Sequence, residues 1–295
     1  QIVGGKAYCA HQGRGLSVAD VAGPNWPSEI ARLAPGWMAY HVVVKGNTAF
    51  VAAGLDGLVA VNVGGPTPSQ VAKVALGGNL RACDWSGNTL VAAALGGGVE
   101  VYDIANPAAP VRRAVIDAGG DWATCVAVSG TRAYVGAGAK IRIYDVGNAS
   151  APVRVGEAAL GDFAMGVDVM GTTCVVATDG GGLAVFDVAG PTPLPRGNNK
   201  DALRLFNVRC AGTLAYAAAG ADGILVVDVA DPANPVKVAL TPAGSACYDF
   251  APGPGFAAGD HDDGTLTFED PDGEPVSIAT VRGLPGYDRV HHVDL

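Results

Sequence analysis

The sequence predicts an all-β fold, a seven-bladed β-propeller of four-stranded antiparallel blades. Two observations predict it. One strand-and-turn signature recurs seven times, at intervals of 41 or 42 residues, along a chain of 295 residues. The 43 glycines and 19 prolines also indicate a turn-rich protein rather than a helical one. Because a fixed period of this length is typical of propellers and arrays, the repeat assigns residues 1–295 to a single domain.

Each unit is marked by a strand that ends in Asp or Asn and is followed by a turn, in most units with proline. These end residues are Asp20, Asn62, Asp103, Asp145, Asp187, Asp228 and Asp270. Residues 123–160 contain four short apolar runs bounded by Gly, Asn or Pro, the pattern of an antiparallel meander. A side chain repeated at each strand end is expected to cap the following turn rather than to form a carboxylate array.

The two ends of the chain are predicted to meet. Residues 287–293 have the length and alternation of a first strand, whereas only Gln1 to Val3 precede Gly4. We therefore expect the C-terminal strand to enter the N-terminal blade and to leave no sheet edge exposed.

Charge and hydropathy exclude some classes of partner. The formal net charge is -9 and lysine and arginine form no cluster, so nucleic acid is not an expected partner. No uninterrupted apolar stretch approaches the roughly 20 residues of a membrane span, so membrane insertion is not expected. The chain begins at Gln1 without a signal-like segment, and we expect a mature or trimmed domain that is secreted or lies at the cell surface.

The cysteines and the glycine runs are expected to be structural. Six cysteines are scattered without C-x-x-C spacing, so they are expected to be small buried residues rather than zinc ligands or disulfides. The GGG runs at 96–98 and 180–182 lack the context of a phosphate-binding loop and are expected to form tight hairpins.

The repeat signature resembles a known family. It is clearest in VYDIANPAAPV (101–111) and VVDVADPANPV (226–236), and these motifs resemble the LVIVD-repeat propellers over essentially the whole chain. Asn62 and the shortened turn after Asp270 depart from the pattern. The resemblance implies a propeller and frequent extracellular or surface association, but no single chemistry, so a site must be argued from the residues themselves.

The loops at one end of the channel are the predicted ligand site. In a propeller the loops between blades and the loops between second and third strands gather at one end, where a pocket can form. Aromatic, acidic and arginine residues at this end suit a polar organic ligand, although the aromatics alone would also plug the channel. The predicted substrate-binding residues are Arg14, Trp37, Tyr40, Arg81, Trp122, Phe163, Tyr248 and Arg289.

All five histidines fall in the seventh, first and second blades, which are neighbours in a closed ring. The candidates for catalysis are His11, His41, His261 and His291, with Asp262, Asp263 or Asp288 nearby. His291 and His292 are adjacent on a strand, so only one of them can face the pocket. Convergent imidazoles fit acid-base chemistry or a divalent metal, but no H-x-H or H-E-x-x-H spacing supports coordination, and no metal ligand or cofactor is assigned.

Two functions remain open on the sequence alone. The first is a propeller enzyme, a lyase, hydrolase or isomerase, acting on a small or oligomeric polar substrate at the channel mouth. The second is a secreted or surface-attached scaffold that recognises a protein or a glycan through the same face. The sequence does not decide the oligomeric state.

Overall fold

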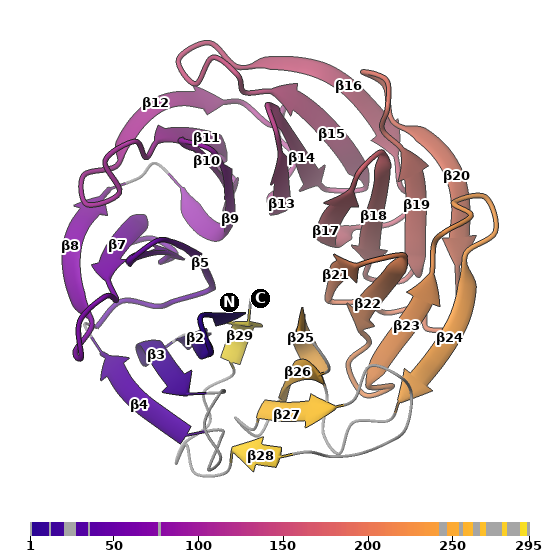
Figure 1. Cartoon of the computed structure of the whole chain (residues 1–295). Coiled ribbons are helices and arrows are strands. Elements are labelled where there is room, and N and C mark those ends of the chain that lie inside the picture. Colours follow the sequence, from indigo (N-terminus) through magenta and orange to yellow (C-terminus); the bar gives the residue numbers. More distant parts are fainter. Residues whose placement is uncertain are drawn as a thin grey trace.

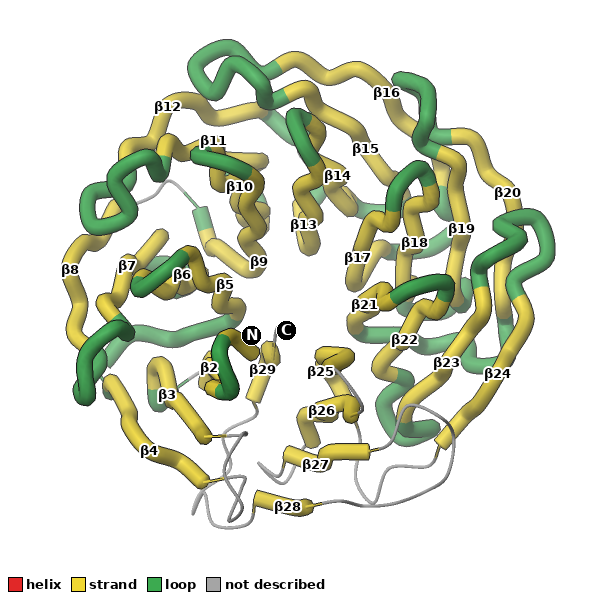
Figure 2. The backbone as a smooth tube through the Cα atoms, in the orientation of Figure 1, coloured by secondary structure: helices red, strands yellow, loops and turns green. Residues whose placement is uncertain are grey.

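The computed structural model describes residues 2–11, 13–20, 28–34, 36–75, 78–241, 247–253, 256–261, 266–269, 279–281 and 290–293. At residues 2, 28, 241, 248 and 250, and from residue 251 onward, the backbone alone is described. All regular elements in these ranges are β-strands, joined by short loops (Figure 2).

Each sheet is a meander of strands that are consecutive in the chain, and all strand pairings among the described residues are antiparallel. The first sheet contains β1 (Ile2–Val3), β2 (Lys6–His11), β3 (Gly15–Asp20) and β4 (Ser28–Leu33), and β29 (Val290–Val293) also pairs with β2. The following sheets are β5 (His41–Lys45), β6 (Thr48–Ala52), β7 (Leu58–Asn62) and β8 (Ser69–Val74), then β9 (Asn79–Ser86), β10 (Thr89–Leu95), β11 (Gly98–Asp103) and β12 (Val111–Ile116).

The remaining sheets repeat the same four-strand order. They are β13 (Ala123–Ser129), β14 (Arg132–Ala137), β15 (Lys140–Asp145) and β16 (Val153–Ala159), then β17 (Ala164–Met170), β18 (Thr173–Thr178), β19 (Leu183–Asp187) and β20 (Leu194–Asn199). The last two are β21 (Asn207–Ala211), β22 (Leu214–Ala218), β23 (Ile224–Asp228) and β24 (Val236–Thr241), then β25 (Cys247–Gly253), β26 (Phe256–His261), β27 (Leu266–Glu269) and β28 (Ala279–Val281).

The sheets are arranged around a common axis, with the first strand of each sheet innermost and the fourth outermost (Figure 1). In the first sheet, β1 and β29 share the inner edge of β2: Ile2 pairs with Ala7, and Val293 pairs with Cys9. The chain is therefore an all-β propeller, as the repeat predicts, and its first and last described strands, β1 and β29, lie together beside the axis (Figure 1).

The hydrophobic core lies between sheets rather than within them. Each buried apolar cluster combines two neighbouring sheets, as when Phe50 and Leu58 pack with Leu90 and Tyr102. A four-stranded meander has two apolar faces and can bury both only against its neighbours, so burial of apolar surface holds each sheet in place. Carboxylates add specific links, because Asp84 Oδ2 on β9 accepts a hydrogen bond from Val128 N on β13 at 2.6 Å.

The repeated acidic residues cap turns, which confirms the structural role predicted for them. Asp103 Oδ1 accepts a hydrogen bond from Ala105 N at 2.9 Å, and Asn62 Oδ1 accepts one from Gly64 N at 3.0 Å. Asp145, Asp187 and Asp228 make the same contact two residues ahead. The amide of Asn62 therefore caps its turn as the carboxylates do. The turn after Asp20 and residue Asp270 lie outside the described residues.

The cysteines and glycine runs also behave as predicted. All six cysteines are free thiols on strands, and five of them are buried. Gly96 and Gly98 have φ of 69° and 82°, and Gly182 has φ of 81°, the left-handed backbone that tight hairpins need. Within the described residues, no helix could span a lipid bilayer.

Candidate functional site

A cavity of about 570 Å³ occupies the channel at the end where the loops between sheets gather. We call it the channel cavity. Five consecutive sheets, from the sheet of β5 to the sheet of β21, contribute to its walls. The described residues that line it are Tyr40, His41, Arg81, Ala82, Leu95, Trp122, Thr124, Cys125, Val126, Phe163, Met165, Val167, Asp179, Phe206, Asn207 and Arg209.

A repeated backbone irregularity aims several of these side chains at the cavity. On β9, Ala82 lies opposite Ala93 and Leu80 opposite Ala94, so Arg81 is an extra residue in a β-bulge. Thr124 on β13 and Met165 on β17 are extra residues at the same place in their sheets. Because a bulge redirects the side chain of its extra residue, this device gives each of these three sheets one residue that lines the channel.

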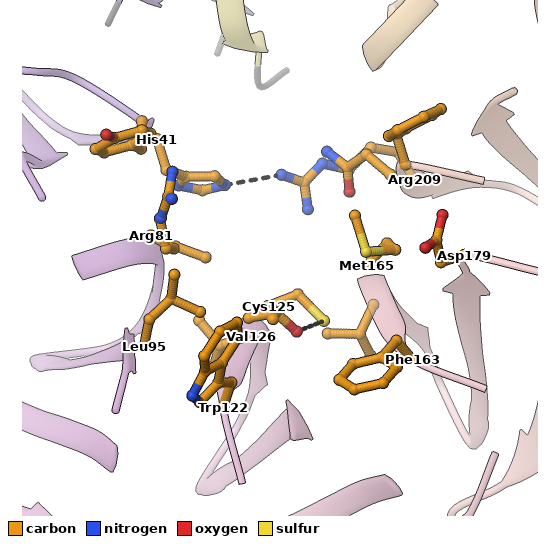
Figure 3. A pocket seen from close by; sticks show the side chains of 16 residues that line it. His41, Arg81, Leu95, Trp122, Cys125, Val126, Phe163, Met165, Asp179 and Arg209 are labelled. Atoms are coloured by element: carbon orange, nitrogen blue, oxygen red, sulfur yellow. Dashed lines mark hydrogen bonds between the residues drawn. The ribbon is translucent and has the colours of Figure 1, made fainter. Parts of the chain in front are cut away.

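One side of the channel cavity is basic, formed by His41, Arg81 and Arg209, which we call the basic wall (Figure 3). His41 is only 7% exposed, and its Nε2 lies 3.2 Å from Arg209 Nη2. A guanidinium has donors but no acceptor, so Nε2 accepts this hydrogen bond and the imidazole is neutral. Burial, reinforced by the charge of Arg209, holds the pKa of His41 well below its usual value, in agreement with this geometry.

Arg81 is held by stacking. Its guanidinium carbon lies 4.0 Å from the centre of the Tyr40 ring, a cation–π contact that sets the plane of the guanidinium. Tyr40 in turn packs against Gly54, where a Cβ would lie 2.7 Å from Tyr40 Cε2. Arg81 Nε is buried and has no hydrogen-bond partner among the described residues. The basic wall therefore contains a donor that the described part of the chain does not satisfy.

The opposite side of the channel cavity is apolar, formed by Leu95, Trp122, Val126 and Phe163, which we call the apolar wall (Figure 3). Trp122 and Phe163 come from the loops that precede β13 and β17, and they are 59% and 53% exposed. Exposed aromatic rings on the wall of a preformed cavity are typical of ligand-binding sites.

A buried arginine supports the loop that carries Trp122. Arg142 on β15 is 3% exposed, and it donates hydrogen bonds to Ala118 O at 2.6 Å, to Asp121 Oδ2 at 2.5 Å and to Glu157 Oε2 at 2.7 Å. Hydrogen bonds from Lys140 and then Arg142 lower the pKa of Asp121. These hydrogen bonds fix Asp121, the residue before Trp122, to strand β15.

The described lining of the cavity contains two arginines, Arg81 and Arg209, although the whole chain is acidic. Asp179 is the carboxylate among the lining residues, and its Oδ1 pairs with Arg204 Nε at 2.7 Å at the rim. Arg81 Nε has no hydrogen-bond partner among the described residues, so an acceptor atom of a ligand is favoured on that side of the cavity.

The structure brings together five of the residues predicted from sequence. His41, Tyr40, Arg81, Trp122 and Phe163 all line the channel cavity.

Three other predicted residues lie elsewhere, and the structure corrects their placement. His11 is 1% exposed and its Nε2 lies 2.6 Å from Ser17 Oγ, so this histidine belongs to the first sheet and not to the cavity lining. Trp37 is buried in the core between the first two sheets and donates from Nε1 to Gln70 Oε1 at 3.0 Å. Arg14 follows β2 in a turn and does not line the cavity. Core packing and local hydrogen bonds account for these positions.

The remaining predicted residues are not tested. Tyr248, His261 and His291 lie on described strands, but their side chains are outside the description, and Arg289 lies outside it altogether, as do Asp262, Asp263 and Asp288. The register makes Tyr248 the extra residue of a bulge on β25, and His291 the extra residue on β29. Their backbones thus occupy the position that Arg81 has on β9.

Sequence reasoning did not single out Arg209, Met165 or Thr124. A signal for two of them exists, because counting back six residues from the glycine that ends each first strand leads to Tyr40, Arg81, Thr124, Met165 and Phe206. All five line the cavity. Arg209 lies three residues before Gly212, deeper in the channel, and no pattern in a single repeat separates it from a solvated residue.

Cys125 lines the cavity but is not an activated thiol, because burial raises its pKa to about 11. Among the described residues, no group of three or more His, Cys, Asp or Glu side chains is placed to hold a metal ion.

The sheets and the cavity define a β-propeller with a two-sided pocket in its channel. The chain carries LVIVD repeats, matched at residues 36–76, 119–159 and 206–239, which confirms the resemblance predicted from the motifs. The comparison with curated proteins gave no match.

Solved structures similar to this chain share its fold at low identity. A functionally unknown protein from Desulfotomaculum acetoxidans is 14% identical, with a TM-score of 0.79 over 97% of this chain and 99% of that one. A chain of the Mitotic Checkpoint Complex is 14% identical, with a TM-score of 0.67 over 88% and 80%. BamB from Moraxella catarrhalis is 13% identical, with a TM-score of 0.63 over 95% and 83%. At these identities the likeness concerns the fold alone.

Proposed function

We propose that this propeller binds a small organic ligand in the channel cavity. The observation that carries the proposal is the cavity itself, about 570 Å³ in volume, with a basic wall facing an apolar wall. This volume lies in the range of small-molecule sites, and the combination of aromatic walls with a few placed polar groups is their usual composition.

A cavity-filling variant tests this function. Compounds from a mixed library that raise the melting temperature of the native protein should not raise that of Leu95→Trp, because the larger ring occupies the cavity. Val115→Trp, on the exposed outer strand β12, is the matched control and should keep the response. Ligands that stabilise Leu95→Trp as much as the native protein would show that they bind elsewhere and would contradict the proposal.

A second candidate is an enzyme that uses acid-base chemistry at the same site, as a lyase, hydrolase or isomerase. The neutral imidazole of His41 on the cavity wall favours it, because a deprotonated histidine can act as a base at neutral pH if a substrate proton replaces the Arg209 hydrogen bond at Nε2. In that case His41→Gln would abolish turnover of a bound substrate while its affinity changed little. Turnover retained in this variant would exclude His41 as the base.

A third candidate is a secreted or surface scaffold that recognises a protein or glycan. Exposed apolar residues near the channel mouth favour it, chiefly Leu55 at 81% and Leu203 at 54% exposure. One similar structure is a chain of a multiprotein complex, although it shares the fold alone. The double variant Leu55→Ser, Leu203→Ser would weaken the binding of such a partner. It would not change the rise in melting temperature that cavity ligands cause. An unchanged partner affinity would contradict this candidate.

We also propose that the sheets form a closed ring of seven blades, completed by β29. The pairing of Val293 with Cys9 supports this arrangement, because it joins the last described strand to the first sheet. Closure of this kind leaves the inner edge of β2 paired along both of its halves.

A further inference from the structure

Several polar side chains that line the channel cavity are engaged within the protein. Thr124 Oγ1 on β13 donates a hydrogen bond to Ala164 O on β17 at 2.7 Å. Asn207 on β21 donates from Nδ2 to Asp249 on β25, and its Oδ1 accepts from Val208 N at 2.8 Å. These two side chains therefore link neighbouring sheets, and their presence in the lining is explained by the fold.

Arg81 lines the same cavity but is placed in a different way. It is the extra residue of a bulge on β9, and its guanidinium carbon lies 4.0 Å from the centre of the Tyr40 ring. Its Nε is buried and has no hydrogen-bond partner among the described residues. A guanidinium donates in its own plane, so stacking on Tyr40 leaves its donors available. A buried donor without a partner is costly, and a ligand oxygen that pairs with it removes this cost whether or not the oxygen is charged.

The cavity surface that continues from Arg81 is apolar. Leu95 comes from the same sheet as Arg81, and Trp122 comes from the loop before β13 of the next sheet. Leu95 lies between Arg81 and Trp122 in the view of Figure 3, and Phe163 lies beyond Trp122. Flat aromatic rings pack well against exposed aromatic side chains such as Trp122 and Phe163. One hydrogen-bond donor therefore stands at the start of a surface that suits an aromatic body.

We propose that the ligand is a flat aromatic compound that carries a carbonyl oxygen, with this oxygen accepting a hydrogen bond from Arg81 and the rings lying along Leu95, Trp122 and Phe163. This inference rests on the proposed function and adds the chemical class and the orientation of the ligand. Tyr40 is a positioning residue, because it holds the Arg81 guanidinium by stacking. Arg81 then discriminates between aromatic compounds with and without an acceptor at this end.

The test compares 2-acetonaphthone with 2-isopropenylnaphthalene, in which a methylene group replaces the carbonyl oxygen, by calorimetric titration of the native protein. The two compounds have nearly the same shape and neither is charged. The ketone should bind about 10- to 100-fold more tightly, the factor expected for a hydrogen bond from a charged donor.

Variants assign this preference to Arg81. Arg81→Met keeps an apolar side chain of similar length without donors, so it should bind the ketone and the alkene with similar affinity, whereas Arg81→Lys should retain part of the preference. Arg113→Met is the matched control, because Arg113 lies on β12 of the same sheet and is 43% exposed, and it should bind both compounds as the native protein does. Naphthalene-2-carboxylate also has a carbonyl-type oxygen and should lose affinity in Arg81→Met. A loss for this anion without a loss for the ketone would show that Arg81 acts through its charge alone and would overturn the inference.

The outcomes separate the inference from the proposed function. Equal affinity for ketone and alkene in the native protein, with both lost in Leu95→Trp, would overturn the carbonyl assignment and leave the small-molecule site standing. Binding of neither compound, while other compounds stabilise the native protein but not Leu95→Trp, would also overturn the inference alone. If no compound distinguished the native protein from Leu95→Trp, the proposed function would fail and the inference with it. Because the comparison of ketone and alkene uses the native protein, a failure of an Arg81 variant to fold does not affect it.

Discussion

His41 and Arg209 are 168 residues apart in the chain, yet their Nε2 and Nη2 atoms lie 3.2 Å apart in the channel. Their strands, β5 and β21, belong to sheets that are not neighbours around the axis (Figure 1). The contact therefore depends on the arrangement of the whole propeller and not on one pair of packed sheets. It also fixes the protonation state of the histidine, because the arginine can only donate.

The stability of the protein should depend on pH through His41. Its folded-state pKa lies well below the usual value near 6.5, first because of burial and then because of Arg209. The unfolded chain therefore binds the proton more readily, so stability is fully present above about pH 6.5 and falls as pH drops toward the folded-state pKa. One proton contributes at most about 1.4 kcal/mol per pH unit. Denaturant unfolding between pH 7 and 5 should show a shallower decline in His41→Gln, and equal slopes would contradict the assignment.

Gly54 should be required for the position of Tyr40. Alanine at Gly54 would place Cβ 2.7 Å from Tyr40 Cε2 on a backbone with φ of 61°. Gly46 has nearly the same φ of 59° but nothing within 4 Å, so Gly46→Ala reports backbone strain alone, about 1 to 2 kcal/mol. Gly54→Ala should cost about 1 to 3 kcal/mol more, from the clash with Tyr40, in chemical denaturation. Equal losses in the two variants would mean that the Tyr40 ring moves aside freely.

Arg142 should stabilise the loop that carries Trp122. Arg142→Leu removes hydrogen bonds to Ala118, Asp121 and Glu157 and should lower the free energy of unfolding by about 1 to 3 kcal/mol. Arg154 is 55% exposed and also contacts Glu157, so Arg154→Leu is the matched control, with a change within about 0.5 kcal/mol. The tryptophan emission of Arg142→Leu should also shift relative to the control. Similar stabilities would show that the loop holds its position without this arginine.

The propeller and the role of its repeated acids were predictable because both follow from a pattern that recurs. An Asp or Asn at the same place in each unit, such as Asp103 and Asn62, can only have a role that each unit shares. The alternation of apolar residues likewise predicts the positions of the strands, because each strand packs on neighbouring sheets in the same way.

The site was only partly predictable, since it depends on where the repeats differ. Tyr40, Arg81, Trp122 and Phe163 were found because they lie in the expected loops or beside them. His11 and Trp37 were misplaced because a residue near a loop can turn into the core, as Trp37 does toward Gln70. Arg209 was missed because its importance comes from His41 on a distant strand, and the spacing of one repeat carries no trace of that contact.

A disulfide should form between β2 and β29 if the chain ends meet as the register indicates. Val293 lies directly opposite the free thiol of Cys9, and opposite residues of antiparallel strands have Cα atoms about 4.5 to 5.5 Å apart, within the range that a disulfide spans. Val293→Cys should therefore cross-link to Cys9 under mild oxidation, be identified by mass spectrometry of the digested protein, and raise the melting temperature, because the bridge links residues far apart in the chain. His292→Cys is the matched control, since it lies opposite Ala10, and it should not cross-link to Cys9 with comparable yield. Equal cross-linking in the two variants, or none in Val293→Cys, would contradict this register and with it the closure of the ring by β29.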